Sequence, residues 1–139
     1  MIDPYQIYET KASGGDCILL IVAALDLAQL NDFSQLAEEL NLDVLIEVHS
    51  EDELNIALSV DPRLVGINNR DLTSFEVDKN LAKELAKQIS NDVIVVSESG
   101  ISSKKDILSS KEQGIHAFLI GESFMRKPSP GEALREILA

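Results

Sequence analysis

The sequence DVIVVSESGI, Asp92 to Ile101, decides the fold that we predict for this chain. Four consecutive apolar residues, Val93 to Val96, run without alternation into the polar set Ser97-Glu98-Ser99-Gly100. An unbroken β-branched run is typical of a parallel strand that is buried on both faces. The polar set therefore lies where this strand ends, and the carboxyl ends of strands are where α/β proteins bind ligands.

A second strand end of the same kind follows along the chain. The apolar run from Ala117 to Ile120 leads directly into Gly121-Glu122-Ser123. A glycine at such a place lets backbone N–H groups approach an anion closely. Two neighbouring strand ends that each carry a glycine and a serine could hold one phosphate group between them.

Composition limits the kind of protein that contains these strand ends. The 139 residues are 45% apolar, which is enough for a single domain with a buried core, and we assign residues 1–139 to one domain. The formal charge of −12 disfavours nucleic acid and anionic membranes as partners. The single cysteine, Cys17, lies in an apolar run and is predicted to be a buried, unpaired thiol. No stretch resembles a membrane span or a signal peptide, so we expect a cytoplasmic protein.

Helices and strands alternate along the rest of the sequence. A helix is predicted to begin at Asp3-Pro4, and strands are predicted at residues 17–22, 43–48, 64–68, 93–96 and 117–120. Each strand is followed by a predicted helix, at Phe33 to Leu40, after the capping-box sequence Ser50-Glu51-Asp52-Glu53, after a cap at Asp78, after Ser102 or Ser103, and after Ser129-Pro130. The result is an α/β chain, α(βα)5, with five parallel strands. Spacing alone leaves open a doubly wound sheet or part of an eight-stranded barrel, which five strands cannot close.

Several polar residues at these strand ends are candidates for chemistry. Glu47 interrupts the apolar strand DVLIEV, so its carboxylate either reaches solvent or is paired, protonated or turned toward a site. The sequence Asn68-Asn69-Arg70-Asp71 is either a solvated turn with an Arg–Asp pair or part of the same site. Glu98 either pairs with a cation from a neighbouring strand or lies in solvent. His49 and His116 lack the spacing of metal ligands and are expected to be structural or solvated.

At this point the residues carry a family resemblance that covers essentially the whole chain. In order, the sequence resembles indole-3-glycerol phosphate synthase in six motifs: Ile2 to Glu9 (IDPYQIYE), Ile18 to Val22 (ILLIV), Leu45 to His49 (LIEVH), Gly66 to Leu72 (GINNRDL), Val96 to Ile101 (VSESGI) and Phe118 to Met125 (FLIGESFM). The resemblance implies part of a (βα)8 (TIM) barrel, with the five strands equivalent to strands four to eight.

The resemblance also implies an activity in tryptophan biosynthesis. This family closes the ring of a carboxyphenylamino-deoxyribulose phosphate, releasing CO2 and water, as a carboxy-lyase that uses no cofactor or metal. By resemblance Glu47 is the catalytic carboxylate, Asn68 holds the reacting region of the substrate, and Arg70 supports it. Contacts to the phosphorylated substrate are implied for Glu98, Ser99, Gly100, Gly121 and Glu122.

One catalytic residue of the family lies outside the part that this chain resembles. The general-acid lysine lies on the third strand of the family barrel, and this chain resembles the family only from the following helix onward. We therefore expect the chain alone to be inactive, with a non-catalytic phosphate-binding or interaction module as the alternative function. Because two strands would lack a neighbour, we also expect a homo-oligomer, most simply a dimer, or a complementing N-terminal fragment as partner.

Overall fold

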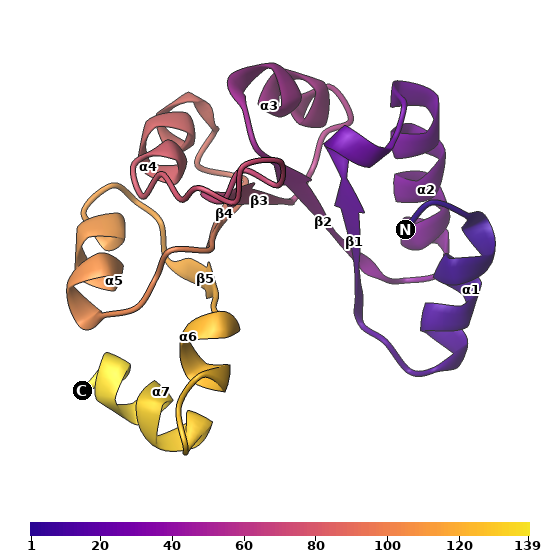
Figure 1. The fold of residues 1–139 in the computed structure, drawn as a ribbon. Coiled ribbons are helices and arrows are strands. Elements are labelled where there is room, and N and C mark those ends of the chain that lie inside the picture. The colour runs from indigo at the N-terminus through magenta and orange to yellow at the C-terminus, as the bar shows by residue number, and fades with distance from the viewer.

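Five strands form the inner side of an arc in the computed structural model, which describes all residues from 1 to 139 (Figure 1). Every neighbouring pair is parallel, and the strands follow one another in sequence order across the sheet. They are β1 (Cys17–Ile21), β2 (Asp43–Val48), β3 (Leu64–Asn68), β4 (Ile94–Glu98) and β5 (Ala117–Leu119). A doubly wound sheet would require a reversal of strand order. The consecutive order therefore decides for part of a (βα)8 barrel.

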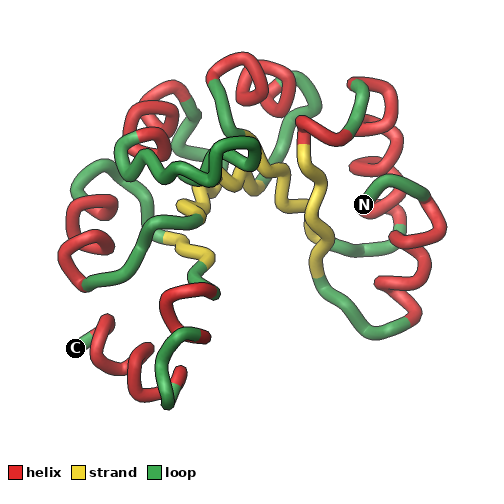
Figure 2. The backbone as a smooth tube through the Cα atoms, in the orientation of Figure 1, coloured by secondary structure: helices red, strands yellow, loops and turns green.

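The helices lie along the outside of this arc (Figure 2). They are α1 (Pro4–Ala12), α2 (Leu27–Glu39), α3 (Glu51–Leu58), α4 (Leu81–Leu85), α5 (Lys104–Lys111), α6 (Glu122–Met125) and α7 (Pro130–Leu138). Short 3-10 turns follow β1 at Val22–Ala24 and α4 at Ala86–Gln88. No helix is both long and apolar enough to span a membrane.

Local sequence explains most helix starts, with two corrections. Ser103 caps α5 with a full capping box, in which the Asp106 side chain accepts from the Ser103 N–H. At α3 the predicted box is only half formed, because the Glu53 carboxylate accepts instead from the N–H of His49, at 2.7 Å. The predicted cap at Asp78 is wrong. Its carboxylate accepts from the Asn80 N–H, and α4 begins after Asn80 without a side-chain cap.

The main core lies between the sheet and the helices. It is built from alternate residues of the strands, such as Leu20 and Ile46, and from inward residues of the helices, such as Leu30 and Leu54. A smaller cluster under α5 and α7 consists of Ile101, Ile107 and Ile137. Alternation of side chains along a strand sends every second residue to this outer, helix-covered face.

The opposite, inner face of the sheet is open, which corrects two predictions. Ile94, on the inner face of β4, is 55% exposed, so the apolar run of this strand is not buried on both faces. Cys17 is exposed, because it begins β1 on the same inner face and at the edge of the sheet. An uninterrupted apolar run therefore marks a barrel strand whose inner residues face the barrel interior.

Candidate active site

Three polar side chains gather on the inner face at the carboxyl ends of adjacent strands. Glu47 is the second-last residue of β2, Asn68 is the last residue of β3, and Glu98 is the last residue of β4. Their exposed fractions are only 5%, 8% and 3%. The Asn68 amide donates to Glu47 Oε1 at 3.3 Å, and its Oδ1 accepts from the N–H of Arg70 at 3.1 Å. The Asn68 side chain is therefore held by Glu47 at its amide nitrogen and by the Arg70 N–H at its oxygen.

Glu47 and Glu98 form a buried pair of carboxyl groups. Burial, followed by the hydrogen bond and the negative charge of Glu47, raises the pKa of Glu98 from 4.5 to about 8. Glu98 Oε1 has no hydrogen-bond partner, and no cation forms an ion pair with this residue. Both interpretations of Glu98 made from the sequence, a cation-paired and a solvated carboxylate, are thus wrong. A pKa raised in this way favours the protonated form of Glu98 at neutral pH.

His49 connects this pair to helix α3, which sequence reasoning missed. Its Nε2 lies 3.1 Å from Glu47 Oε1, although out of line for a hydrogen bond, and its Nδ1 lies 3.2 Å from Glu53 Oε2. The same Glu53 oxygen accepts from the His49 N–H. The signal in the sequence was spacing, because His49 follows Glu47 by two residues at a strand end and precedes Glu53 by four.

Asn69 belongs to a segment that the sequence singled out, but its own role was not predicted. It is 4% exposed, and its side-chain amide donates to Ser97 Oγ and to the backbone carbonyls of Glu98 and Ser99, at 3.2, 2.9 and 3.1 Å. Its Oδ1 accepts from the N–H of Ala82 in α4. Asn69 therefore holds the end of β4 in place from the neighbouring strand. The predicted alternative of a solvated turn is therefore wrong for Asn68 and Asn69, whereas Asp71 is exposed.

The turn after β4 exposes backbone donors. Ser99 and Gly100 both have left-handed backbone conformations, with φ of 59° and 76°. A side chain at Gly100 would also lie 2.6 Å from Val77 Cγ1, so glycine is required there for conformation and space. The backbone N–H groups of Ser99, Gly100 and Gly121 donate no hydrogen bond within the chain. These are unused donors at two neighbouring strand ends.

Charged side chains surround these donors. Arg70 Nη2 lies 2.6 Å from Glu122 Oε2, and Arg126 Nη2 lies 2.6 Å from the other Glu122 oxygen. Arg70 therefore pairs with Glu122 and not with Asp71. Lys79 binds Asp106 at 3.0 Å. Burial raises the pKa of Asp106, but hydrogen bonds from Lys79, the Ser102 N–H and Ser103 outweigh burial and lower it to about 2.

A cavity of about 820 Å³, which we call the mouth cavity, joins these groups. Its lining includes the predicted site residues Asn68, Arg70, Glu98, Ser99, Gly100, Gly121 and Glu122. Glu47 is not part of the lining but contacts Asn68 and Glu98. The structure thus brings seven of the eight predicted residues to one cavity and the eighth into contact with two of them.

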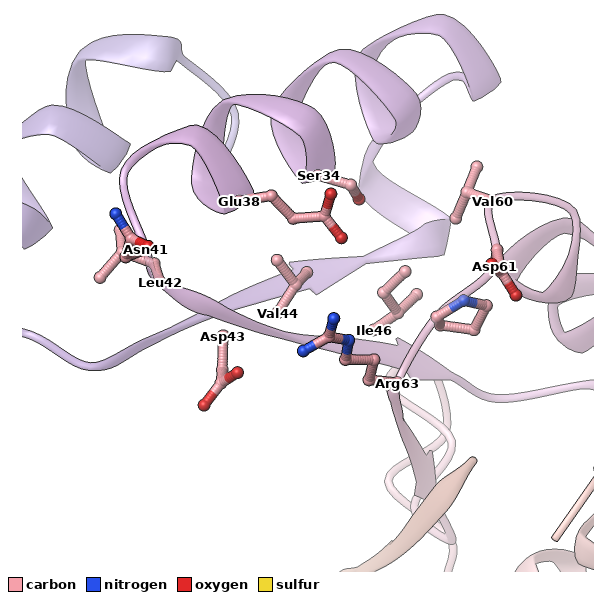
Figure 3. Close-up of a pocket in the computed structure, with 11 residues that line it drawn as sticks. Ser34, Glu38, Asn41, Leu42, Asp43, Val44, Ile46, Val60, Asp61 and Arg63 are labelled. Atoms are coloured by element: carbon pink, nitrogen blue, oxygen red, sulfur yellow. The ribbon is translucent and has the colours of Figure 1, made fainter. Parts of the chain in front are cut away.

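Another cavity, of about 380 Å³, lies between α2 and the loop before β3, on the helix side of the sheet (Figure 3). It shares no lining residue with the mouth cavity. Three carboxylates, Glu38, Asp43 and Asp61, line it beside the single cation of Arg63. This charge balance opposes an anionic ligand. Nowhere in the chain do three or more His, Cys, Asp or Glu side chains converge as metal ligands would.

Comparison with known proteins identifies relatives of this chain. The family model for indole-3-glycerol phosphate synthase matches residues 1–137. The indole-3-glycerol phosphate synthase of Delftia acidovorans is 50% identical over 139 residues, which are 100% of this chain and 52% of that protein. That of Legionella pneumophila (strain Paris) is 50% identical over 138 residues, 99% of this chain and 54% of that protein. The chain thus spans about half the length of the curated relatives it matches.

Solved structures extend the likeness in fold. A mandelate oxidase mutant with an FMN adduct matches with a TM-score of 0.75 at 14% identity, covering 96% of this chain and 50% of that one. A native KDPGal structure matches with a TM-score of 0.69 at 14% identity, covering 99% of this chain and 62% of that one. At this level of identity the likeness concerns the fold alone.

Proposed function

The chain belongs to the indole-3-glycerol phosphate synthase family, and from this premise we propose that it supplies the carboxylate and phosphate-binding side of that active site. The reaction is the ring closure of a carboxyphenylamino-deoxyribulose phosphate in tryptophan biosynthesis, with loss of CO2 and water. The observation that carries the proposal is the mouth cavity. It places buried carboxyl and amide groups beside unused backbone donors.

Glu47 is the proton acceptor during ring closure and dehydration. Its carboxylate receives a hydrogen bond from Asn68, and Glu98 contacts it as a carboxylic acid. A buried, positioned carboxylate of this kind suits general base catalysis. Asn68 orients the hydroxyl groups of the substrate, because its side chain is held from both ends.

The phosphate group of the substrate binds between the ends of β4 and β5. The N–H groups of Ser99, Gly100 and Gly121 are free to donate, and the N–H of Glu122 stands next to them. Arg70 adds a cation from the end of β3, and Glu98 lines the same cavity from the end of β4. Phosphate sites at the last strand ends are common in (βα)8 barrels.

The chain alone does not turn over this substrate. The carbonyl-protonating lysine of the family has no counterpart among residues 1–139. Three cations line the mouth cavity: Arg70 and Arg126 share Glu122, and Lys79 pairs with Asp106. Loss of one general acid lowers a rate by about 10²- to 10⁴-fold.

Turnover measurements test this function directly. The purified chain is assayed with the carboxyphenylamino-deoxyribulose phosphate, alone and mixed with the half of the Delftia acidovorans relative that this chain does not match. We expect no turnover from the chain alone and measurable turnover from the mixture. Glu47→Gln should lower the turnover of the mixture by about 10²-fold or more. The matched control Glu39→Gln, on the exposed side of α2, should not change it.

Each outcome separates one part of the proposal from another. Robust turnover by the chain alone would contradict the missing acid. Full turnover of the Glu47→Gln mixture would contradict the role of Glu47. An inactive mixture that still binds phosphate would favour a non-catalytic phosphate-binding module.

A further inference from the structure

Gly66 lies in the middle of β3 on the inner face, between the two carboxyl groups of the site. In the sheet register it stands beside Glu47 of β2 on one side and Val96 of β4 on the other. A Cβ atom built at Gly66 would lie 2.1 Å from Glu98 Oε1 and 3.1 Å from Glu98 Cδ. The carboxyl group of Glu98 thus occupies the space that any other residue at position 66 would fill.

The backbone gives no other reason for a glycine at this position. Gly66 does not have a positive φ, unlike Gly14, Gly100 and Gly114. The nearest atom outside Glu98, Leu45 Cδ1, would lie 3.4 Å from the added Cβ, which is an ordinary van der Waals distance. A glycine inside a strand weakens the strand and often marks a close approach of another group. Here the group that approaches is the Glu98 carboxyl.

We propose that Gly66 is a positioning residue, whose missing side chain lets the Glu98 carboxyl group cross β3 to the Glu47 carboxyl group, so that the pair holds one proton. Glu98 comes from two strands away from β2. It reaches Glu47 only over the backbone of β3, and Gly66 is where that backbone carries no side chain. The use of this proton in ring closure rests on the proposed function above, whereas the contact itself does not.

The groups around the pair favour one shared proton. His49 and Asn68 contact Glu47 from its own strand end and from β3. Glu53 of α3 holds the far side of His49. Arg70, Arg126 and Lys79 line the mouth cavity, but the two arginines contact Glu122 and Lys79 contacts Asp106. No Lys or Arg side chain contacts either Glu47 or Glu98, and like charges this close favour protonation of one of the two carboxyl groups.

Infrared spectroscopy of the intact chain with ¹³C-labelled glutamate tests the proposal without substrate. Near neutral pH the wild-type chain should show the carbonyl band of one protonated carboxyl group, and Glu98→Gln should remove it. Gly66→Ala should also remove this band, because the new Cβ atom displaces the Glu98 carboxyl group from its buried position toward the open cavity. The control Gly131→Ala, whose added Cβ would meet nothing within 4 Å, should keep the band.

A double-mutant cycle guards against a general folding defect. In the wild-type background, Gly66→Ala should lower the folding equilibrium constant by about threefold or more, because the Glu98 carboxyl group must move. In the Glu98→Ala background the same change should have an effect of less than about threefold, because the clashing atoms are gone. A Gly66→Ala chain that keeps the infrared band, or that loses stability equally in both backgrounds, would overturn the proposal. If the infrared and stability results are as expected but the mixed assay shows no turnover, the proposed function is contradicted and the contact between Glu98 and Glu47 is not.

Discussion

Leu19 and Leu20 are neighbours in β1 but face opposite sides of the same sheet. Leu20 is fully buried under the helices, whereas Leu19 is only partly buried on the open inner face. The same division holds across the sheet, where Ile46 and Val65 belong to the core and Ile94 is exposed. The outer face therefore supplies the stability of the chain. The inner face carries the candidate site and is packed less tightly.

The largest effect should come from removing a side chain on the outer face. Leu20→Ala should lower the free energy of unfolding by roughly 3–5 kcal/mol, because it opens a cavity in a closed core. Leu19→Ala removes the same atoms from the adjacent residue. It should lower the free energy of unfolding by less than about half as much, since water already reaches this side chain. Urea unfolding of both variants measures the difference. Equal losses would show that the inner face is packed as tightly as the outer one.

The next largest effect is a dependence of stability on pH, which arises from Glu98 on the inner face. The pKa of Glu98 is raised from 4.5 to about 8 in the folded chain. Below pH 4.5 both folded and unfolded chains carry the proton, so its stabilising contribution is fully present there. As pH rises toward 8 only the unfolded chain loses the proton readily, and the contribution is lost.

At about 1.4 kcal/mol per pKa unit, and allowing for shared titration with Glu47, this loss is roughly 2–3 kcal/mol. Asp106 acts in the opposite sense, because its pKa is lowered from 3.8 to about 2, and its contribution is lost as pH falls through that interval. Urea unfolding at a series of pH values should show the alkaline loss in the wild type and not in Glu98→Gln. A loss of the same size in Glu98→Gln would assign it to another group.

A smaller effect concerns the helix that begins beside the mouth cavity. Ser103 caps α5 with its side chain, whereas Ser129 begins α7 without a side-chain cap bond. Ser103→Ala should therefore lower the free energy of unfolding by about 1 kcal/mol. Ser129→Ala should change it by only a few tenths of that. Thermal unfolding of the two variants provides the measurement, and a larger loss for Ser129→Ala would contradict the role of the cap.

The smallest effect should be on the binding of inorganic phosphate. Glu122 holds Arg70 and Arg126 at the rim of the mouth cavity and adds a negative charge there. Exposed ion pairs of this kind are worth about 0.2–1 kcal/mol, so Glu122→Gln should raise phosphate affinity by roughly two- to fivefold. Glu132→Gln breaks an equivalent pair with Arg135 on α7, outside the cavity, and should leave affinity unchanged. Equal gains in both variants would indicate an effect of net charge alone.

The sequence was sufficient for features that depend on local patterns. Apolar runs located all five strands, and Asp3-Pro4 and Ser129-Pro130 located the first and last helices. Strand ends predicted where Glu47, Asn68 and the Ser99-Gly100 turn would lie. These predictions succeed because a run of side chains and a helix cap are decided by residues close together in sequence.

Features that depend on contacts between strands were not predictable in this way. The burial of Glu98 depends on the space above Gly66 and on Glu47 two strands away. The part of Asn69 in holding β4 depends on carbonyl groups about 30 residues further along the chain. The exposure of Cys17 and Ile94 depends on what covers the inner face. The apolar run of a strand does not predict that cover. The predicted homo-oligomer or complementing fragment concerns the same face and stays a prediction.

A titration with inorganic phosphate, followed by amide chemical shifts, tests the central claim that the ends of β4 and β5 form an anion site. The N–H groups of Ser99, Gly100 and Gly121 are unused within the chain and line one cavity. We expect these three amides to shift together and to saturate, while the left-handed Gly14 and Gly114, far from the cavity in sequence, do not shift. Shifts elsewhere in the chain, with none at these three amides, would contradict the account.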